Sequence, residues 1–300
     1  MYNPQLETFI MVADAGSFNK AAEQIYITPT AVIKQINLLE ANLGVKLFDR
    51  THRGLKLTKA GISLYKDVKY IIQYCKDSVI RAQNAMQEDT QILRIGSSPL
   101  TPAQILLELW PKIQAYCSDI KFQIIPFENT EENAREILKN LGNRIDVVAG
   151  IFDDTMLNLR NCDGFEIKKV PLCVAVSIHH PLAAKRKLAV SDLYGQSLLL
   201  MHRGWSCYVD DLRDDIWQHH NQIQIKDFDF YDVNIFNRCE NGNEILMAIE
   251  AWSVVHPLLK IIPVDWDHSI PYGLLHSPQP SPTVKKFLDA IQKVIQQDKE

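Results

Sequence analysis

The chain has 300 residues, of which 46% are hydrophobic and 23% are charged, and its formal net charge is −4 at pH 7. These values fit a globular protein of two or more domains, and no run approaches the ~18 apolar residues that would read as a membrane span. The first residues, MYNPQLETFI, lack the basic start and long apolar core of a secretory signal, so we expect a cytoplasmic protein.

Two short helices are predicted near the N-terminus. The first opens at Phe18, after Gly16 and Ser17, and ends near Ile25. Ser17 supplies a hydroxyl of the kind that caps helices.

The second helix is predicted to begin at Pro29, after a turn over residues 26–28. Thr28 is placed to cap its first amides, and proline fits the first helical position because its missing N–H would have been unpaired. Gly44 is the expected terminating residue. The apolar stripe of this helix consists of Val32, Ile36, Leu39 and Leu43. The opposite face, left to solvent or to a partner, carries Thr30, Ile33, Lys34 and Asn37.

Such a pair of helices is either a plain helical hairpin or a helix-turn-helix unit, whose second helix enters the major groove of DNA. The residues that follow favour DNA, because five cations stand against Asp49 alone. These cations are Lys46, Arg50, Arg53, Lys56 and Lys59. Two short apolar pieces, 47–48 and 55–57, predict a two-stranded wing with Arg53 at its tip, where it would suit the narrow minor groove.

A third helix is predicted from Thr58 to about Glu88, roughly 46 Å long at 1.5 Å per residue. Its apolar residues alternate at intervals of three and four: Tyr65, Val68, Ile72, Cys75, Val79, Ala82 and Met86. An ordinary core helix is one explanation of this seam. The strict heptad spacing favours pairing with the same helix of a second copy, and therefore a homodimer.

Beyond residue 90, strands and helices alternate. Strands are expected over 92–98, 121–127 and 144–152, with helices starting at Thr101 and Glu131. After Asn161 the pattern restarts. Further strands are expected in FEIKKVPLCVAVSIHHPLA, SLLLMHRGWS, IQIKDFDFYD, KIIPVD and YGLLHS, and further helices in NEILMAIEA and TVKKFLDAIQKVIQQ. This alternation predicts parallel α/β sheets with ligands at the carboxyl ends of the strands.

The run from Ser17 to Gly61 resembles the N-terminal domain of the LysR-type transcriptional regulators, whose pattern is close to SFxxAAxxLxxSQxAVSxQIxxLExxLGxxLFxRxxRxxxLTxAG. SFNKAAEQI, AVIKQINLLEANLGVKLFDR and LKLTKAG follow it in order and without a gap. Pro29 and Ile33 stand where the pattern has glutamine and serine, and neither can make the corresponding hydrogen bond, although Ile33 could meet a thymine methyl. The resemblance implies DNA contacts from Ser17, Thr28, Pro29, Thr30, Ile33, Lys34, Arg50 and Arg53.

The remainder resembles the two-lobed, type 2 periplasmic-binding-like sensor of the same family through LRIGSS, RIDVVAG and HHPLA. The expected fold is therefore α/β multidomain. Residues 1–58 would form a winged helix-turn-helix DNA-binding domain, 59–90 a dimerisation linker helix and 91–300 an effector-binding domain. Lobe one would take about 91–161 and 266–300, and lobe two about 162–265. Trp252 and Ser253 replace a glycine-rich family segment and are expected to reshape the cleft.

By that similarity the effector cleft would be lined by Ser98, Thr101, Phe152, Arg203 and Trp205, all at strand carboxyl ends. Each has a simpler explanation: Ser98 and Thr101 as helix caps, Phe152 as core and Arg203 as a solvated charge. An arginine beside an aromatic residue would suit a carboxylate on an apolar body, so a carboxylate effector is expected.

The chain carries no GxSxG, HExxH, Walker or GxGxxG motif, so we do not expect an enzyme. Asp146, Asp153 and Asp154 are the available carboxylates, and the aspartate pair next to a strand end is expected in a solvated loop. The six cysteines form no CxxC pair, and Cys207 with Cys239 is the pair to consider for redox sensing. The histidine doublets 179–180 and 219–220 lack a second pair of ligands, so neither a metal nor another cofactor is expected.

The sequence thus predicts a transcriptional regulator that binds double-stranded DNA as a homodimer or homotetramer, under the control of a small-molecule effector. RNA polymerase is a further partner that the resemblance implies. A thiol redox-sensing regulator of the same family, and a small-molecule-binding protein without a DNA function, are the alternatives.

Overall fold

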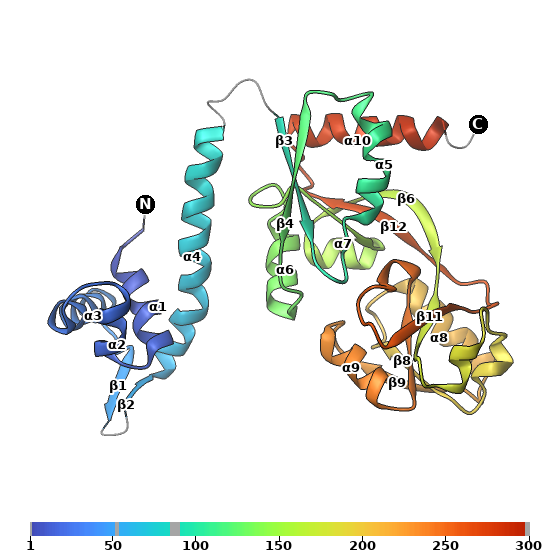
Figure 1. The fold of residues 1–300 in the computed structure, drawn as a ribbon, viewed down its shortest axis with the longest axis horizontal. Helices are drawn as coiled ribbons and strands as arrows, with labels where there is room; N and C mark the ends of the chain where they lie inside the picture. Colours follow the sequence, from blue (N-terminus) through green and yellow to red (C-terminus); the bar gives the residue numbers. More distant parts are fainter. Residues whose placement is uncertain (1, 52–53, 85–90, 298–300) are drawn as a thin grey trace. The chain divides into compact units, whose positions relative to one another are not determined.

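The structure, a computed structural model, describes residues 2–51, 54–84 and 91–297 (Figure 1). It divides into two compact units, Met1–Glu88 and Asp89–Glu300, each with its own core. Among the described residues, no helix has the length and apolar character needed to cross a lipid bilayer.

The first unit is a small helical domain with a hairpin. Its elements are α1 (Gln5–Ala15), α2 (Phe18–Gln24), α3 (Pro29–Leu43), β1 (Phe48–Thr51), β2 (Gly54–Leu57) and α4 (Lys59–Asn84). The sequence did not predict α1, which packs against α2, α3 and α4 and contributes Phe9 and Val12 to the core. The two strands pair antiparallel, Phe48 opposite Leu57, which is the geometry of a wing.

Local sequence signals account for the start of α3. The Thr28 hydroxyl accepts a hydrogen bond from the Ala31 amide (3.2 Å), and Pro29 takes the first helical position. Gly44 ends the helix with φ of 69°, a left-handed conformation that favours glycine. Ser17 stands at the N-cap of α2, although its side chain makes no capping hydrogen bond.

The buried face of α3 differs from the expected stripe in its last turn. Val32, Ile36 and Leu39 are buried, but Leu43 is 45% exposed and Glu40 is buried instead. The Glu40 carboxylate accepts hydrogen bonds from the amides of Leu47 (2.8 Å) and Phe48 (3.3 Å). A charged residue therefore joins α3 to the first strand of the wing, which an apolar periodicity cannot reveal.

Only the first part of the apolar seam of α4 packs against the core of its own domain. Tyr65, Val68 and Ile72 pack against the core of the first unit, with Val68 fully buried. The first part of the seam thus stabilises the domain itself, contrary to its assignment to dimerisation. Val79 is 41% exposed, and Met86 lies outside the described residues.

The second unit contains two mixed five-stranded sheets. The sheet of lobe one has the order β4-β3-β5-β12-β6, in which β4, β3 and β5 are parallel and β12 is antiparallel to both of its neighbours. Its strands are β3 (Gln91–Ser97), β4 (Ile120–Pro126), β5 (Val147–Ile151), β6 (Asp163–Pro171) and β12 (Ser269–His276). The helices α5 (Gln104–Gln114) and α10 (Pro282–Gln297) cover one face, and α6 (Glu131–Lys139) and α7 (Asp154–Arg160) cover the other.

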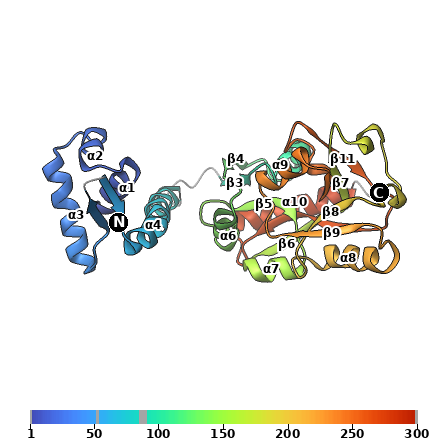
Figure 2. The ribbon, with the colours of Figure 1, turned by 90° about the horizontal axis from the view of Figure 1, so that it is seen from below.

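The sheet of lobe two has the order β11-β7-β10-β8-β9, in which β10, β8 and β9 are parallel. Its strands are β7 (Cys173–Ser177), β8 (Ser197–Met201), β9 (Gln224–Phe228), β10 (Glu244–Ala248) and β11 (Leu259–Pro263). The helices α8 (Cys207–His219) and α9 (Val233–Asn241) lie on opposite sides of this sheet (Figure 2). Three short 3-10 helices complete the lobe: η1 (Pro181–Ala184), η2 (Val190–Leu193) and η3 (Glu250–Trp252).

The chain passes between the lobes twice, near Leu172 and near His268. These two crossing segments lie side by side, because the Leu172 amide donates to the His268 carbonyl (2.9 Å). They form a natural hinge between the lobes.

Four predictions about the second unit were wrong. Strand β6 pairs with β12 in the sheet of lobe one, so lobe two begins after residue 171 and not at 162. The segment NEILMAIEA forms strand β10 followed by η3, not a helix: its apolar residues are buried in the middle of a sheet, and a short apolar run fits either element. The sheets are mixed, not parallel throughout. The helix expected from Thr101 begins at Gln104, because Ser98 and Thr101 form a tight turn in which each amide bonds to the other's carbonyl. The helices α7, α8 and α9 were not predicted.

Candidate DNA-binding and effector sites

The outward face of α3 carries most of the residues expected to contact DNA. Thr30 and Lys34 are exposed, and Ile33 is half-buried between them. Thr28 and Pro29 are exposed at the N-terminal end of the same helix, where the Thr28 hydroxyl is already engaged as the helix cap. A helix that presents its N-terminal end and one polar face in this way can enter a major groove.

The wing is the second element for which the sequence predicts contacts with DNA. Arg53 lies outside the described residues. The backbone of Arg50 belongs to β1, and its side chain is likewise outside the described part of the structure.

Tyr26 is a residue that the sequence did not single out. It lies in the turn between α2 and α3, is 95% exposed and has φ of 56°. A left-handed conformation costs a non-glycine residue ~1–2 kcal/mol, so an aromatic side chain held there in full exposure is a candidate for contact with a partner.

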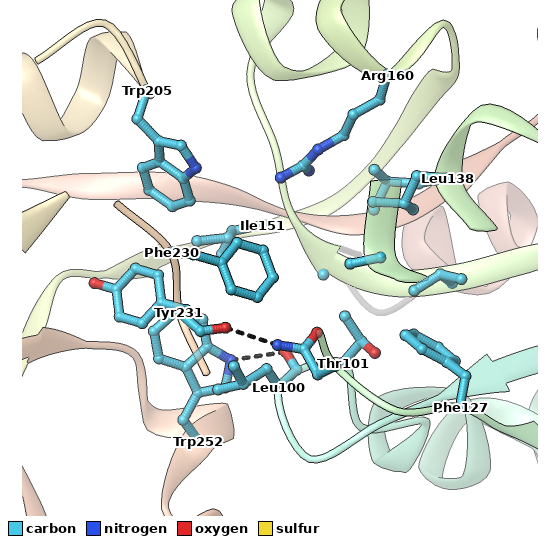
Figure 3. Close-up of a pocket in the computed structure, with 15 residues that line it drawn as sticks. Leu100, Thr101, Phe127, Leu138, Ile151, Arg160, Trp205, Phe230, Tyr231 and Trp252 are labelled. Carbon is cyan, nitrogen blue, oxygen red and sulfur yellow. Dashed lines mark hydrogen bonds between the residues drawn. The ribbon is translucent and has the colours of Figure 1, made fainter. Parts of the chain in front are cut away.

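A cavity lies between the two lobes of the second unit, at the carboxyl ends of the parallel strands (Figure 3). Its volume is about 90 Å³. The lining is largely apolar and includes Leu100, Phe127, Ile151, Trp205, Phe230, Tyr231 and Trp252. Its polar members are Thr101, Asn129 and Arg160. Such a site matches the usual form of a small-molecule pocket, in which a few polar groups orient an apolar ligand.

Arg160 is the cation of this cavity. It lies at the end of α7, and Figure 3 shows its guanidinium directed into the cavity. Burial lowers the pKa of the guanidinium, which remains protonated at neutral pH. Within the described part of the chain, no carboxylate lies within ion-pair distance of it. The Asp153 carboxylate favours the charged form of Arg160 from beyond ion-pair distance, which leaves the guanidinium available to an anionic ligand.

Three of the five predicted effector residues lie at the cavity or beside it. Thr101 and Trp205 are in the lining, and the Ser98 hydroxyl lies 2.7 Å from that of Thr101. Ser98 itself is buried and does not line the cavity. Of the two residues expected to reshape the cleft, Trp252 is in the lining of this cavity and Ser253 is not.

The structure places the other two elsewhere. Phe152 is 6% exposed and packs with Leu138 and Met156 in the core of lobe one, while its neighbour Ile151 faces the cavity because successive residues of a strand point to opposite sides. The side chain of Arg203 is 57% exposed and forms an ion pair with Asp214. Neither Phe152 nor Arg203 therefore lines this cavity, whereas Ile151 and Arg160 do.

The aspartates after β5 do not form a solvated loop. Asp153 is 4% exposed, and its Oδ1 caps α7 by accepting from the Met156 amide (2.8 Å). Its Oδ2 accepts from the Cys207 amide (2.8 Å), at the start of α8 in the other lobe. Asp146 is also buried and pairs with Arg94 (2.6 Å). These carboxylates are structural.

The surroundings of Cys207 and Cys239 disfavour the redox-sensing alternative. All six are free, and Cys239 is fully buried, with its thiol bonded to the carbonyls of Ala175 and Glu244. Burial raises the pKa of Cys239 to about 12 and also raises the pKa of Cys207, which disfavours reactive thiolates. Over the described ranges, no group of three or more His, Cys, Asp or Glu side chains is arranged to hold a metal ion.

The winged helix-turn-helix unit and the two-lobed sensor together define a bacterial type of ligand-controlled regulator. Residues 4–62 match the family model described as "Bacterial regulatory helix-turn-helix protein, lysR family", and residues 86–296 match the "LysR substrate binding domain". The chain belongs to the LysR family of transcriptional regulators, which places it among regulators, not enzymes.

Individual relatives are distant. The Hca operon transcriptional activator HcaR of Escherichia coli (strain K12) is 27% identical over 190 residues, 63% of this chain and 62% of that protein. The match to the hydrogen peroxide-inducible genes activator of Haemophilus influenzae is 24% identical and covers 93% of this chain and 87% of the relative. Several curated relatives are thus matched over less than two thirds of their length.

Among solved structures, that of CbnR, described as a LysR family transcriptional regulator, has a TM-score of 0.69 at 19% identity and covers 98% of this chain and 99% of CbnR. A structure of full-length CbnR with its target DNA has a TM-score of 0.68 at 18% identity, with the same coverage of both chains. This similarity confirms the expected fold.

Proposed function

We propose that this chain is a transcription regulator that reads double-stranded DNA with α3 and the wing and is controlled by a small molecule bound between its two lobes. The observation that carries the proposal is the outward face of α3, with Thr30, Ile33 and Lys34, in a chain of the LysR family. Thr30 and Lys34 would contact base edges and phosphates, and Ile33 a thymine methyl. Ser17, Thr28 and Pro29 would pack against the backbone of the same groove, with Arg50 and Arg53 reaching an adjacent one.

The effector is proposed to be a carboxylate on an apolar body. Arg160 supplies the charge, and Trp205, Tyr231 and Trp252 supply flat apolar surface. Ser98 would act through the Thr101 hydroxyl that it contacts.

The regulator is proposed to act as a homodimer or homotetramer. Along α4, Ile71 (38%) and Val79 (41%) are exposed apolar residues that a second copy would cover. Residues 59–90 would then act as a linker between a DNA-binding domain over 1–58 and a sensor over 91–300. Two DNA-binding domains carried in this way would read half-sites about 34–36 Å apart. RNA polymerase bound at the neighbouring promoter would be a further partner.

Gel retardation tests the proposal. Full-length protein should shift DNA from upstream of its own gene at low salt, and the affinity should fall steeply with salt, with a log-log slope of about −0.9 for each phosphate contact. A folded protein that binds small molecules but does not shift this DNA would favour the alternative of a binding protein without a DNA function.

The preference for a carboxylate is tested separately by thermal shift with three probes. Benzoate has both an aromatic ring and a charge, acetate has only the charge, and benzamide has only the ring. Benzoate should stabilise the protein most, and Arg160→Gln should remove its advantage over benzamide. Arg203→Gln is the matched control, since Arg203 is exposed and already paired with Asp214. Equal shifts by benzoate and benzamide would rule out a charge-selective site.

A further inference from the structure

The cavity that contains Arg160 continues into a larger space. This second space has a volume of about 620 Å³ and shares four lining residues with the cavity: Leu100, Phe127, Asn129 and Phe230. We call it the outer chamber. Its size is that of the pockets in which proteins bind small molecules. A ligand held by Arg160 can therefore extend past the shared residues into the outer chamber.

The outer chamber differs from the cavity in charge. Its lining includes three carboxylates, Glu128 and Glu131 beside the start of α6 and Asp232 at the start of α9. No lysine, arginine or histidine is among the described residues that line it. The lining of the cavity has the opposite composition, with Arg160 as a cation and no carboxylate. The two connected spaces therefore have opposite polarity.

Part of the negative charge of the outer chamber is already balanced. Glu131 pairs with Arg135 on the next turn of α6. The N-termini of α6 and α9 each contribute about half a positive charge, and Asp232 offsets that of α9 by accepting from the Ile235 amide (3.0 Å). Within the described part of the chain, no cation forms an ion pair with Glu128 or Asp232. About one negative charge remains, and the exposed Glu128 carboxylate carries it.

The residues shared by the two spaces supply an apolar surface and one further acceptor. Leu100, Phe127 and Phe230 are the apolar members, and in the view of Figure 3 Phe230 lies between Arg160 and Leu100. The side-chain nitrogen of Asn129 donates to the Tyr231 carbonyl (2.7 Å), which leaves the side-chain oxygen of Asn129 to accept from a ligand. A cation, an apolar surface and a group of hydrogen-bond acceptors thus follow one another along the connected spaces.

We propose that the effector is a bipolar molecule, with a carboxylate that pairs with Arg160, an apolar body against the shared residues and an ammonium group beside Glu128. This inference rests on the proposed function in taking the cavity as the effector site. A dicarboxylate of the same length would place its second negative charge beside Glu128 and Asp232, so the site discriminates against it.

Calorimetry on the full-length protein at neutral pH tests the proposal with two sets of acids. The parent acids are benzoate and phenylpropionate, which differ in the distance between the carboxylate and the ring. Each carries a methyl, an aminomethyl or a carboxylate group at the para position, so that the charge at the far end of a similar body is neutral, positive or negative. For the parent that binds better, the aminomethyl acid should bind about threefold more tightly than the methyl acid, and the dicarboxylate about threefold more weakly, as expected for one solvent-exposed charge contact. Both differences should shrink at about 1 M salt.

Three variants assign the preference to its residues. Glu128→Gln should remove the advantage of the aminomethyl acid. Glu166→Gln is the matched control, because Glu166 is an exposed glutamate of β6 outside the lining of both spaces, and it should retain that advantage. Arg160→Gln should weaken the methyl and aminomethyl acids by the same factor.

Equal affinities for the methyl and aminomethyl acids, or a preference for the aminomethyl acid that survives in Glu128→Gln, would overturn the proposal and leave the carboxylate effector in place. Failure of all six acids to bind would overturn both. Gel retardation measures DNA binding separately, so neither result is confused with a failed regulator assignment.

Discussion

Two buried carboxylates, Glu40 in the DNA-binding unit and Asp153 in the sensor, are both 4% exposed and both accept hydrogen bonds from two backbone amides. Glu40 bonds to Leu47 and Phe48, only a few residues ahead in the chain. Asp153 bonds to Met156 in its own helix and to Cys207, which belongs to a different lobe. The same chemistry therefore holds the wing against α3 in one unit and joins the two lobes in the other.

The largest expected effect comes from Glu40→Ala. It leaves two buried amides without acceptors, so the DNA-binding unit should lose about 3 kcal/mol of unfolding free energy. Denaturant unfolding of the full chain, followed by circular dichroism, measures the loss, and Glu23→Ala on the exposed side of α2 should change little. A loss under ~1 kcal/mol would show that Glu40 does not secure the wing.

The same residue predicts a pH dependence. Burial raises the pKa of the Glu40 carboxyl, but hydrogen bonds from Lys46 and from the amides of Leu47 and Phe48 outweigh burial and hold that pKa below its usual range. The stability it contributes is therefore present above the ordinary glutamate pKa and is lost as the pH falls through the lowered value. Acid titration of the wild type should show this loss, and Glu40→Gln should reduce it.

Asp153→Ala should cost less, about 2 kcal/mol, because part of the loss falls on a contact between lobes that can separate. Thermal unfolding of the sensor transition measures it. Asp154→Ala, beside it at the first residue of α7, is the control. A cost equal to that of Glu40→Ala would remove the contrast between a contact inside one unit and a contact between two lobes.

Lys34→Ala tests the reading face without touching a core. The DNA affinity should fall about tenfold, and the salt slope should become shallower by about 0.9 if Lys34 contacts a phosphate. Fluorescence anisotropy on a defined site gives both values. Lys121 is an exposed lysine of the second unit, so Lys121→Ala should bind DNA with wild-type affinity. Wild-type affinity of the Lys34→Ala variant would show that Lys34 does not contact DNA.

Tyr26→Gly should give the smallest effect on stability, a gain of about 1 kcal/mol, because glycine adopts φ of 56° without strain. If the exposed ring contacts DNA, affinity should drop even as stability rises. Unfolding and anisotropy measured on the same variant separate these effects, and a variant that binds DNA as well as wild type would assign the tyrosine no role there.

The difference between short-range and long-range contacts also explains which parts of the structure could be predicted from the sequence. Thr28, Pro29 and Gly44 act on residues beside them, so the recognition helix could be placed from local rules. Arg160 could not be found from the sequence, because α7 was not predicted and because only the fold brings this residue opposite residues about a hundred positions away, such as Trp252. Strand β10 was read as a helix because a short, fully buried apolar run has no periodicity that separates the two. The sequence placed the cavity in the loops that follow the parallel strands, and the structure has it there. Phe152 nevertheless points to the opposite side of its strand from the cavity.

Genome-wide mapping of the DNA bound by the full-length protein tests the central claim most directly. The account predicts enrichment at discrete sites, including the region upstream of its own gene, with paired half-sites on one face of the duplex. Enrichment should disappear in Lys34→Ala combined with Thr30→Ala. A map without discrete sites, obtained with folded and expressed protein, would contradict the assignment of this chain as a DNA-reading regulator.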